Sequence, residues 1–273
     1  MDNKIKKSSE TITYFLLSLG FTWLIQFPFI FLGARTLTFP YIIFFYLGSA
    51  SPALVAVYLI YKTHDPKVIA EFWQRIIDPN RIRGGFWLVI IFLYPFINIL
   101  ALLSSALVFG SSISFITTIE IINQPLRLIS MAIFLLIFGP LPEEIGWRGF
   151  ALDKLHNKLN MLHSSMIIGL FWALWHLPLF FIPGTYQNNL GVLSLNFWLF
   201  FLTLFPDSIL YTWIYFKNRR STLAAILIHF STNFAGEIFK ISSNAMIIRS
   251  LLITLTAILI IYQWKKQRIY NGT

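Results

Sequence analysis

Long apolar runs recur along this chain and constrain its fold more than any other feature. Hydrophobic residues make up 57% of its 273 residues, whereas charged residues make up only 12%. Soluble domains carry about 25% charged residues, and a helix needs about 20 apolar residues to cross a bilayer. Because backbone groups find no water in lipid, helices that satisfy them internally are expected. The sequence therefore predicts an all-α polytopic membrane protein.

Eight apolar runs are interpreted as transmembrane helices. No internal repeat, low-complexity tract or soluble second domain is visible, so residues 1–273 are interpreted as a single helical membrane domain. The expected spans are residues 11–34, 41–61, 86–109, 127–142, 162–182, 193–216, 221–240 and 246–264.

The positions of the basic residues predict the orientation of these spans. Segments on the side of the two termini hold 17 of the 21 Lys and Arg residues, and the other side holds Arg35, Arg127, Lys240 and Arg249. Lys and Arg concentrate in cytoplasmic loops. We therefore expect both termini in the cytoplasm and the lipid bilayer as a partner. The same distribution explains the net charge of +10, so nucleic acid is not expected as a partner.

The segment between the second and third expected spans, residues 64–85, is long and mixed in charge. Val68, Phe72 and Ile76 recur there at helical spacing. This pattern predicts an amphipathic helix on the cytoplasmic surface.

Two adjacent glutamates follow a pair of prolines in the fourth expected span. The second proline, Pro142, is placed to begin a new helical segment that reaches about His156, with Glu143 and Glu144 in its first turn. Arg148 lies four residues after Glu144, so the two side chains share a helical face and are expected to pair. Ionisable groups at membrane depth are costly and usually mark a functional site.

Two later spans carry polar groups that can meet these glutamates. His176 precedes a helix-loosening Pro178, and His229 lies four residues before Asn233 on one helical face. Counted from the cytoplasmic ends, Glu143, His176 and His229 lie 13, 14 and 8 residues deep, which is roughly 12–21 Å at 1.5 Å per residue. Although a lone buried histidine often only bonds a neighbouring helix, this joint occurrence predicts a shared polar cavity in the cytoplasmic half.

Asp207 lies at a similar depth in the sixth expected span, after Pro206. One hypothesis is that it orients a histidine of the site, as carboxylates often do. The alternative, which we favour slightly, is a local structural contact.

The combined motif set resembles that of the CAAX protease and bacteriocin-processing family of intramembrane proteases (the CPBP, or Abi, family). The resemblance covers about residues 130–240 and implies an eight-helix membrane bundle. At one position the family usually has Phe where this chain has Trp172. The resemblance is carried by Glu143, Glu144, Arg148, Trp172, His176, His229 and Asn233. It implies that all of these residues except Trp172 are catalytic.

The resemblance implies an endopeptidase that cleaves a peptide or membrane-protein substrate. Glu143 would act as the general base and hold the attacking water together with His176. His229 and Asn233 would donate hydrogen bonds to the oxyanion of the tetrahedral intermediate.

A zinc-dependent protease is the alternative mechanism, since Glu143, His176 and His229 could supply three zinc ligands with an open fourth position. However, the chain has no Cys and no His-Glu-x-x-His motif, and Asn233 is a poor zinc ligand. We therefore favour a glutamate mechanism with no cofactor.

Two other functions stay open: a non-proteolytic bacteriocin-immunity or scaffold protein, and a transporter. The complete set of polar groups favours a protease over a scaffold, and their clustering on one side of the membrane disfavours a transporter. A substrate that enters from the cytoplasmic side is expected. The Lys/Asn/Ile-rich composition favours a bacterial plasma-membrane protein that acts on peptides, and the oligomeric state is left open.

Overall fold

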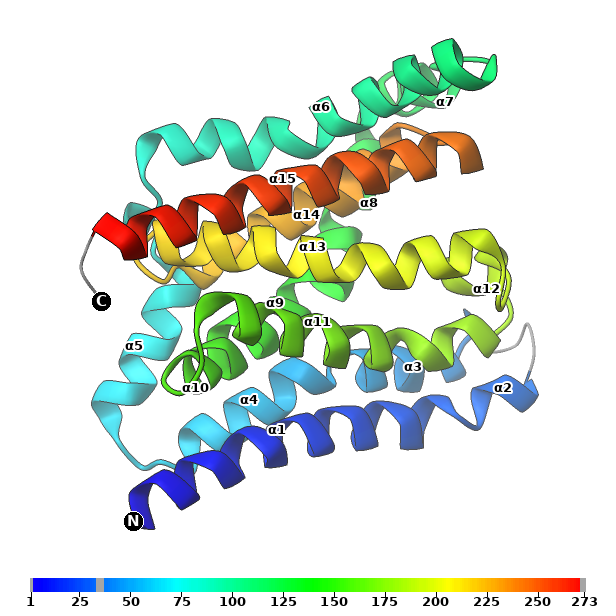
Figure 1. Ribbon diagram of the computed structural model, residues 1–273. Coiled ribbons are helices and arrows are strands. Elements are labelled where there is room, and N and C mark those ends of the chain that lie inside the picture. The colour runs from blue at the N-terminus through cyan, green and yellow to red at the C-terminus, as the bar shows by residue number, and fades with distance from the viewer. Residues whose placement is uncertain (1, 33–36, 271–273) are drawn as a thin grey trace.

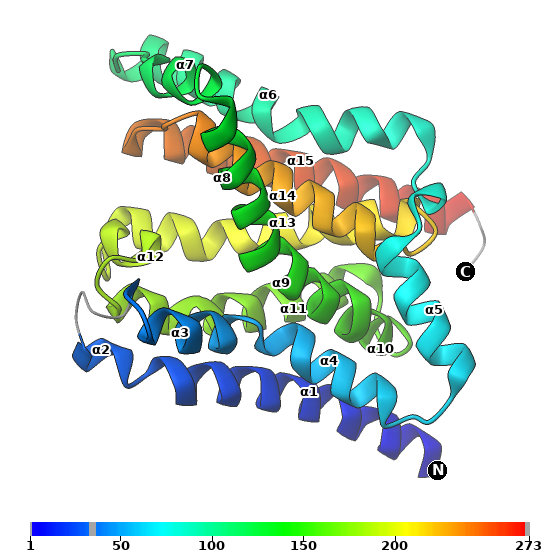
Figure 2. The same cartoon turned by 180° about the vertical axis from the view of Figure 1, so that it is seen from behind.

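The structure is a computed structural model, and its described residues, 2–32 and 37–270, form helices and short connections. Side chains are described for residues 10–32 and 37–266, so Arg35 lies outside the described residues. α1 (Asp2–Gln26) begins and α15 (Ser243–Tyr270) ends at the same end of the molecule, which we call the termini end (Figures 1 and 2). The opposite end, which we call the far end, holds α2, α7 and α12.

The remaining helices follow in chain order. They are α2 (Phe29–Leu32), α3 (Tyr41–Ser49), α4 (Ser51–Tyr61), α5 (Pro66–Ile77), α6 (Gly84–Phe109), α7 (Ile116–Ile122), α8 (Pro125–Phe138), α9 (Pro140–Gly146), α10 (Leu152–His156), α11 (Met161–His176), α12 (Tyr186–Leu190), α13 (Leu195–Lys217) and α14 (Thr222–Ile238). A π-helical segment, Trp147–Ala151, joins α9 to α10, and a 3₁₀ helix, Leu177–Phe181, follows α11.

Six helical runs in the described part of the chain are long and apolar enough to cross a membrane. A seventh candidate consists of α3 and α4 together, which are bent by 56° relative to each other. The prediction of a multi-pass helical membrane protein is therefore confirmed. The six runs are Glu10–Leu32, Gly84–Phe109, Pro125–His156, Met161–Phe181, Leu195–Lys217 and Ser243–Lys266.

Counting the bent pair, the described residues thus contain seven candidate spans, whereas the sequence predicted eight. The difference is the expected span at residues 221–240. The helix observed there, α14, has 17 residues. At 1.5 Å per residue it is about 26 Å long, shorter than the roughly 30 Å hydrocarbon core. It packs against α6, α9 and α13, so it is a short, well-covered helix of the bundle.

The outer faces of the bundle are strongly apolar. Leu24, Leu107 and Leu126 are 78%, 87% and 83% exposed. Many other large hydrophobic side chains of these helices are exposed as well. Lipid chains are the surroundings that such faces require.

The fourth expected span is broken, as the prolines predicted. α8 ends at Phe138 and α9 begins at Pro140, two residues earlier than expected. The new segment continues through the π-helical turn and ends at His156, as predicted. Because α9 starts early, Glu143 lies in its first turn but Glu144 does not, which corrects the prediction for Glu144.

The predicted amphipathic segment forms α5, which covers the termini end of the bundle beside α4 and α14. Phe72 and Ile76 are buried. Arg75 reaches inward and donates hydrogen bonds to Asp153 and to the Tyr215 hydroxyl, each at 2.5 Å. This buried polar network ties α5 to α10 and α13 and closes the termini end.

Candidate active site

Gly139, at the break between α8 and α9, allows two helices to approach closely. A Cβ atom at this position would lie 3.4 Å from Asn233 Nδ2 of α14, 4.0 Å from Glu143 Oε1 and 3.2 Å from the carbonyl oxygen of Leu135. The absence of a side chain therefore brings the Asn233 amide beside the first turn of α9. Glu143 and Asn233 therefore both lie beside Gly139.

Glu143 is buried, with 5% of its surface exposed. Its Oε2 atom accepts a hydrogen bond of 2.5 Å from Nε1 of Trp172 in α11. No hydrogen bond to Oε1 occurs among the described residues, and the side chain lines a cavity. One oxygen thus fixes the carboxylate while the other is available to a molecule in the cavity.

His176 is the last residue of α11, directly before the 3₁₀ helix that contains Pro178. Its Nδ1 atom lies 2.9 Å from the carbonyl oxygen of Trp172. A carbonyl can only accept a hydrogen bond, so we assign the proton to Nδ1. The other ring nitrogen, Nε2, then carries a lone pair.

Glu144 joins Arg148 to His229 in the interior. Its Oε1 atom lies 3.0 Å from Nη1 of Arg148 and 2.9 Å from Nδ1 of His229. The Glu144–Arg148 pair was predicted and is confirmed, whereas the bond from Glu144 to His229 was not predicted. Arg148 also donates from Nη2 to the hydroxyl of Ser208 at 3.0 Å. Glu144 and Arg148 are fully buried, so they lie behind the cavity and support its wall.

Aromatic rings hold this arrangement in place. The Arg148 guanidinium lies 5.3 Å from the ring centroid of Trp172 and 5.1 Å from that of Tyr211. The Trp172 ring also meets the His229 ring edge-on, with centroids 5.2 Å apart. Sequence reasoning missed the roles of Trp172, Ser208 and Tyr211. In the sequence, the only feature that pointed to one of these roles was Trp172, where the family pattern usually has Phe.

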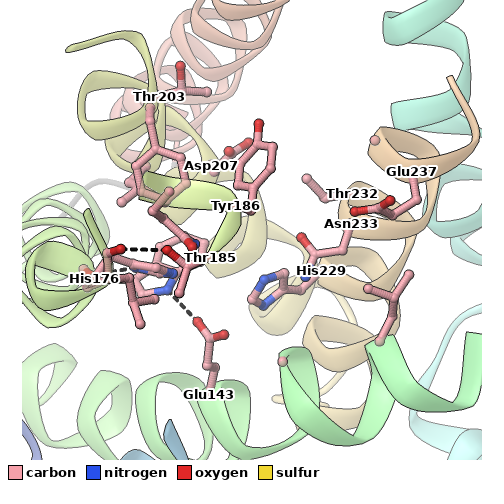
Figure 3. Close-up of a pocket in the computed structure, with 18 of the residues that line it drawn as sticks. Glu143, His176, Thr185, Tyr186, Thr203, Asp207, His229, Thr232, Asn233 and Glu237 are labelled. Carbon is pink, nitrogen blue, oxygen red and sulfur yellow. Dashed lines mark hydrogen bonds between the residues drawn. The ribbon is translucent and has the colours of Figure 1, made fainter. Parts of the chain in front are cut away.

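A cavity of about 460 Å³ connects four of the six predicted site residues, Glu143, His176, His229 and Asn233. Figure 3 shows these side chains facing a common space from α9, α11 and α14. Much of the rest of the lining comes from segments that lead to the far end, including α12, residues 199–211 of α13 and the first two turns of α15. The cavity therefore extends from the middle of the bundle toward the far end.

Asp207 lines the same cavity without bonding either histidine. Its Oδ1 atom accepts a hydrogen bond of 2.5 Å from the Tyr94 hydroxyl of α6. This contact supports the alternative that Asp207 makes a local structural contact. Among the described residues, no hydrogen bond joins Asp207 to a histidine, as the other hypothesis would require.

The three potential zinc ligands, Glu143, His176 and His229, do not converge on one point. In the described part of the chain, no group of three His, Asp or Glu side chains is placed to hold a metal ion. Hydrogen bonds to Trp172 hold Glu143 and His176, and a bond to Glu144 holds His229. This arrangement does not fit a three-ligand zinc site.

Comparison with known proteins agrees with these features. Residues 125–235 match the family described as type II CAAX prenyl endopeptidase Rce1-like. The chain is 31% identical over 255 residues to CAAX prenyl protease 2 of Methanococcus maripaludis, and this similarity covers 93% of each chain. The family match contains all six predicted catalytic residues. The chain therefore belongs to the Rce1-like family of type II CAAX prenyl endopeptidases, and it is a multi-pass intramembrane protease.

Proposed function

We propose that this protein hydrolyses a peptide bond of a peptide or membrane-protein substrate inside the cavity, with a water molecule activated by Glu143. The observation that carries the proposal is the convergence of Glu143, His176, His229 and Asn233, from three helices, on one cavity. Each of these groups offers an atom to the cavity that its own hydrogen bonds leave available.

Glu143 Oε1 and His176 Nε2 would hold the water between two acceptors. The water oxygen attacks the carbonyl carbon as Glu143 takes a proton, forming the tetrahedral intermediate. Glu143 then donates that proton to the leaving nitrogen as the C–N bond breaks, which yields a carboxylic acid and an amine. General acid–base catalysis of this kind contributes about 10²–10⁴-fold to a rate.

His229 and Asn233 would stabilise the oxyanion. Asn233 donates from Nδ2, which lies beside Gly139. His229 bonds Glu144 through Nδ1, which leaves Nε2 for the oxyanion, and donation from both nitrogens requires both to carry a proton. A donor of this kind is worth about 2.7–4 kcal/mol in the transition state.

The proposed orientation places both termini in the cytoplasm. Arg127, Lys240 and Arg249 lie in far-end segments, whereas Arg148 is buried in the site and the other described Lys and Arg side chains belong to termini-end segments. In this orientation the cavity opens toward the external face, because its lining leads to the far end. This proposal differs from the expectation of a cavity in the cytoplasmic half with cytoplasmic access for the substrate.

We further propose that residues 1–273 act as one membrane domain, since the similarity to the archaeal relative covers most of both chains. The name of that relative supports prenylated CAAX proteins as one substrate class. An external cavity mouth favours secreted or membrane-bound peptides, as expected for a prokaryotic plasma membrane. The location in a bacterial membrane stays a prediction.

A comparison of peptides from cells that carry the wild type or Glu143→Gln tests the proposal and does not require an identified substrate. We expect at least one peptide that is processed only in wild-type cells. Identical peptide profiles, with both proteins inserted at equal levels, would overturn the protease proposal in favour of the scaffold alternative.

A further inference from the structure

A second polar group of residues lines the cavity at the far end, away from the proposed catalytic side chains. It consists of Tyr186 of α12, Glu237 of α14 and Arg249 of α15. Figure 3 shows Tyr186 and Glu237 on the side of the cavity away from Glu143. Three different helices therefore contribute to this group.

Arg249 is held by α6 in a way that leaves its guanidinium open. Nε donates a hydrogen bond of 3.0 Å to Oδ1 of Asn98, and the guanidinium lies 5.9 Å from the ring centroid of Tyr94. The two terminal nitrogens have no hydrogen-bond or ion-pair partner in the part of the chain that the structure describes. The side chain is thus fixed through one nitrogen and offers two donors to the cavity.

Arg249 is also the only Lys or Arg among the described residues that line the cavity. Tyr186 is 56% exposed, and the charges of Arg249 and Glu237 both act on its hydroxyl. These three groups are therefore within electrostatic reach of one another. Among the described residues, no ion pair joins Arg249 to Glu237 or Asp207, although Asp207 is close enough for the two charges to interact. A carboxylate in the cavity can therefore still contact the guanidinium directly.

We propose that Arg249 binds a carboxylate of the substrate and thereby determines which peptides are accepted. A guanidinium offers two parallel N–H groups that match a carboxylate. In a peptide the carboxylate is either the C-terminus or an Asp or Glu side chain. The inference rests on the proposed function, because it assumes that a peptide occupies the cavity.

The test measures binding by the inactive Glu143→Gln protein in lipid nanodiscs. The probes are three forms of one fluorescent, farnesylated peptide that ends in Cys-Val-Leu-Ser. The first form has a free C-terminal carboxylate, the second has a carboxamide, and the third has a carboxamide and a Glu in place of Leu. We expect one of the two carboxylate forms to bind about tenfold or more tightly than the uncharged form. The form that binds more tightly shows whether Arg249 recognises the C-terminal carboxylate or an acidic side chain.

The double variant Glu143→Gln/Arg249→Gln should bind all three forms as weakly as the uncharged peptide. Binding of the uncharged peptide at unchanged affinity shows that this variant is folded. As a matched control, Arg127→Gln removes a far-end cation that does not line the cavity, and it should preserve the preference.

Equal binding of all three forms, or a preference that survives Arg249→Gln, would overturn the inference and leave the proposed protease intact. If the Glu143→Gln protein binds none of the three forms, the inference is overturned, and the cellular peptide comparison decides the proposed function separately.

Discussion

Trp172 donates its indole N–H to the Glu143 carboxylate at 2.5 Å and places its ring against His229 and Arg148. A phenylalanine at this position could fill the same space but has no donor. The indole of Trp172 therefore supplies a hydrogen bond to the proposed base that a phenylalanine could not make. This bond was not predictable from the motif, because a motif gives residue spacing but not the direction of an indole N–H.

We expect Trp172→Phe to lower kcat about tenfold with little change in KM. A hydrogen bond to a charged group is worth about 1.5–3 kcal/mol, and 1.36 kcal/mol corresponds to a factor of ten in rate. Steady-state kinetics in proteoliposomes measure this effect. Trp213→Phe, which alters a tryptophan outside the cavity, should leave kcat unchanged. Equal kinetics for Trp172→Phe and the wild type would show that the bond does not position Glu143.

Glu144 is the most deeply buried carboxylate of the site, and two charged or chargeable groups depend on it. Replacing one member of a buried ion pair leaves the other charge unpaired, at a cost of about 3–5 kcal/mol. We expect Glu144→Gln to lower the thermal unfolding midpoint in detergent by about 6–20 °C.

The partly exposed pair between Glu10 and Lys154 offers a control for Glu144→Gln. Glu10→Gln should shift the midpoint by less than about 4 °C, because solvent-accessible pairs contribute about 0–1 kcal/mol. A shift for Glu144→Gln as small as that for Glu10→Gln would contradict the buried pairing of Glu144 with Arg148.

At the scale of elements, the α8–α9 break shows what proline patterns predict and what they miss. The two prolines predicted the interruption and the position of Glu143 in the new first turn. They did not predict that Gly139 would contact Asn233, because that contact depends on α14, nearly a hundred residues later. The length of α14 was also missed, since an apolar run does not show where its helix ends.

Gly139→Ala tests this close approach. The new methyl group would lie 3.2 Å from the backbone oxygen of Leu135, closer than a Cβ atom normally comes, and 3.4 Å from Asn233 Nδ2. We therefore expect the α8–α9 junction to shift by a few tenths of an ångström relative to Asn233. Misplacement of this oxyanion donor should lower kcat/KM by up to about 100-fold.

Gly20→Ala is the control for this substitution, because a Cβ atom at Gly20 meets no other atom within 4 Å. It should leave activity unchanged. Full activity of Gly139→Ala would argue against a catalytic role for this contact.

At the scale of the whole molecule, composition predicted a multi-pass helical membrane protein, and motif spacing predicted which polar residues share a cavity. The direction of the cavity was not predictable. Counting residues from helix ends gives depth along each span, but the lining also depends on how α12, α13 and α15 pack at the far end.

Cysteine labelling tests the proposed orientation, and the chain suits it because it contains no cysteine. Asn189 at the far end and Asn157 at the termini end are both exposed. In intact cells, a membrane-impermeant maleimide should label Asn189→Cys, and it should label Asn157→Cys only after lysis. The reverse pattern would place the termini outside and the cavity mouth in the cytoplasm.

The most direct test of the central claim uses purified protein and a peptide that the cellular comparison identifies as its substrate. Cleavage is measured for the wild type, for Glu143→Gln and for the wild type after exhaustive chelation. A glutamate-activated water predicts a loss of about 10²-fold or more in kcat for Glu143→Gln and unchanged turnover after chelation. Full activity of Glu143→Gln, or activity that chelation abolishes and zinc restores, would contradict the mechanism.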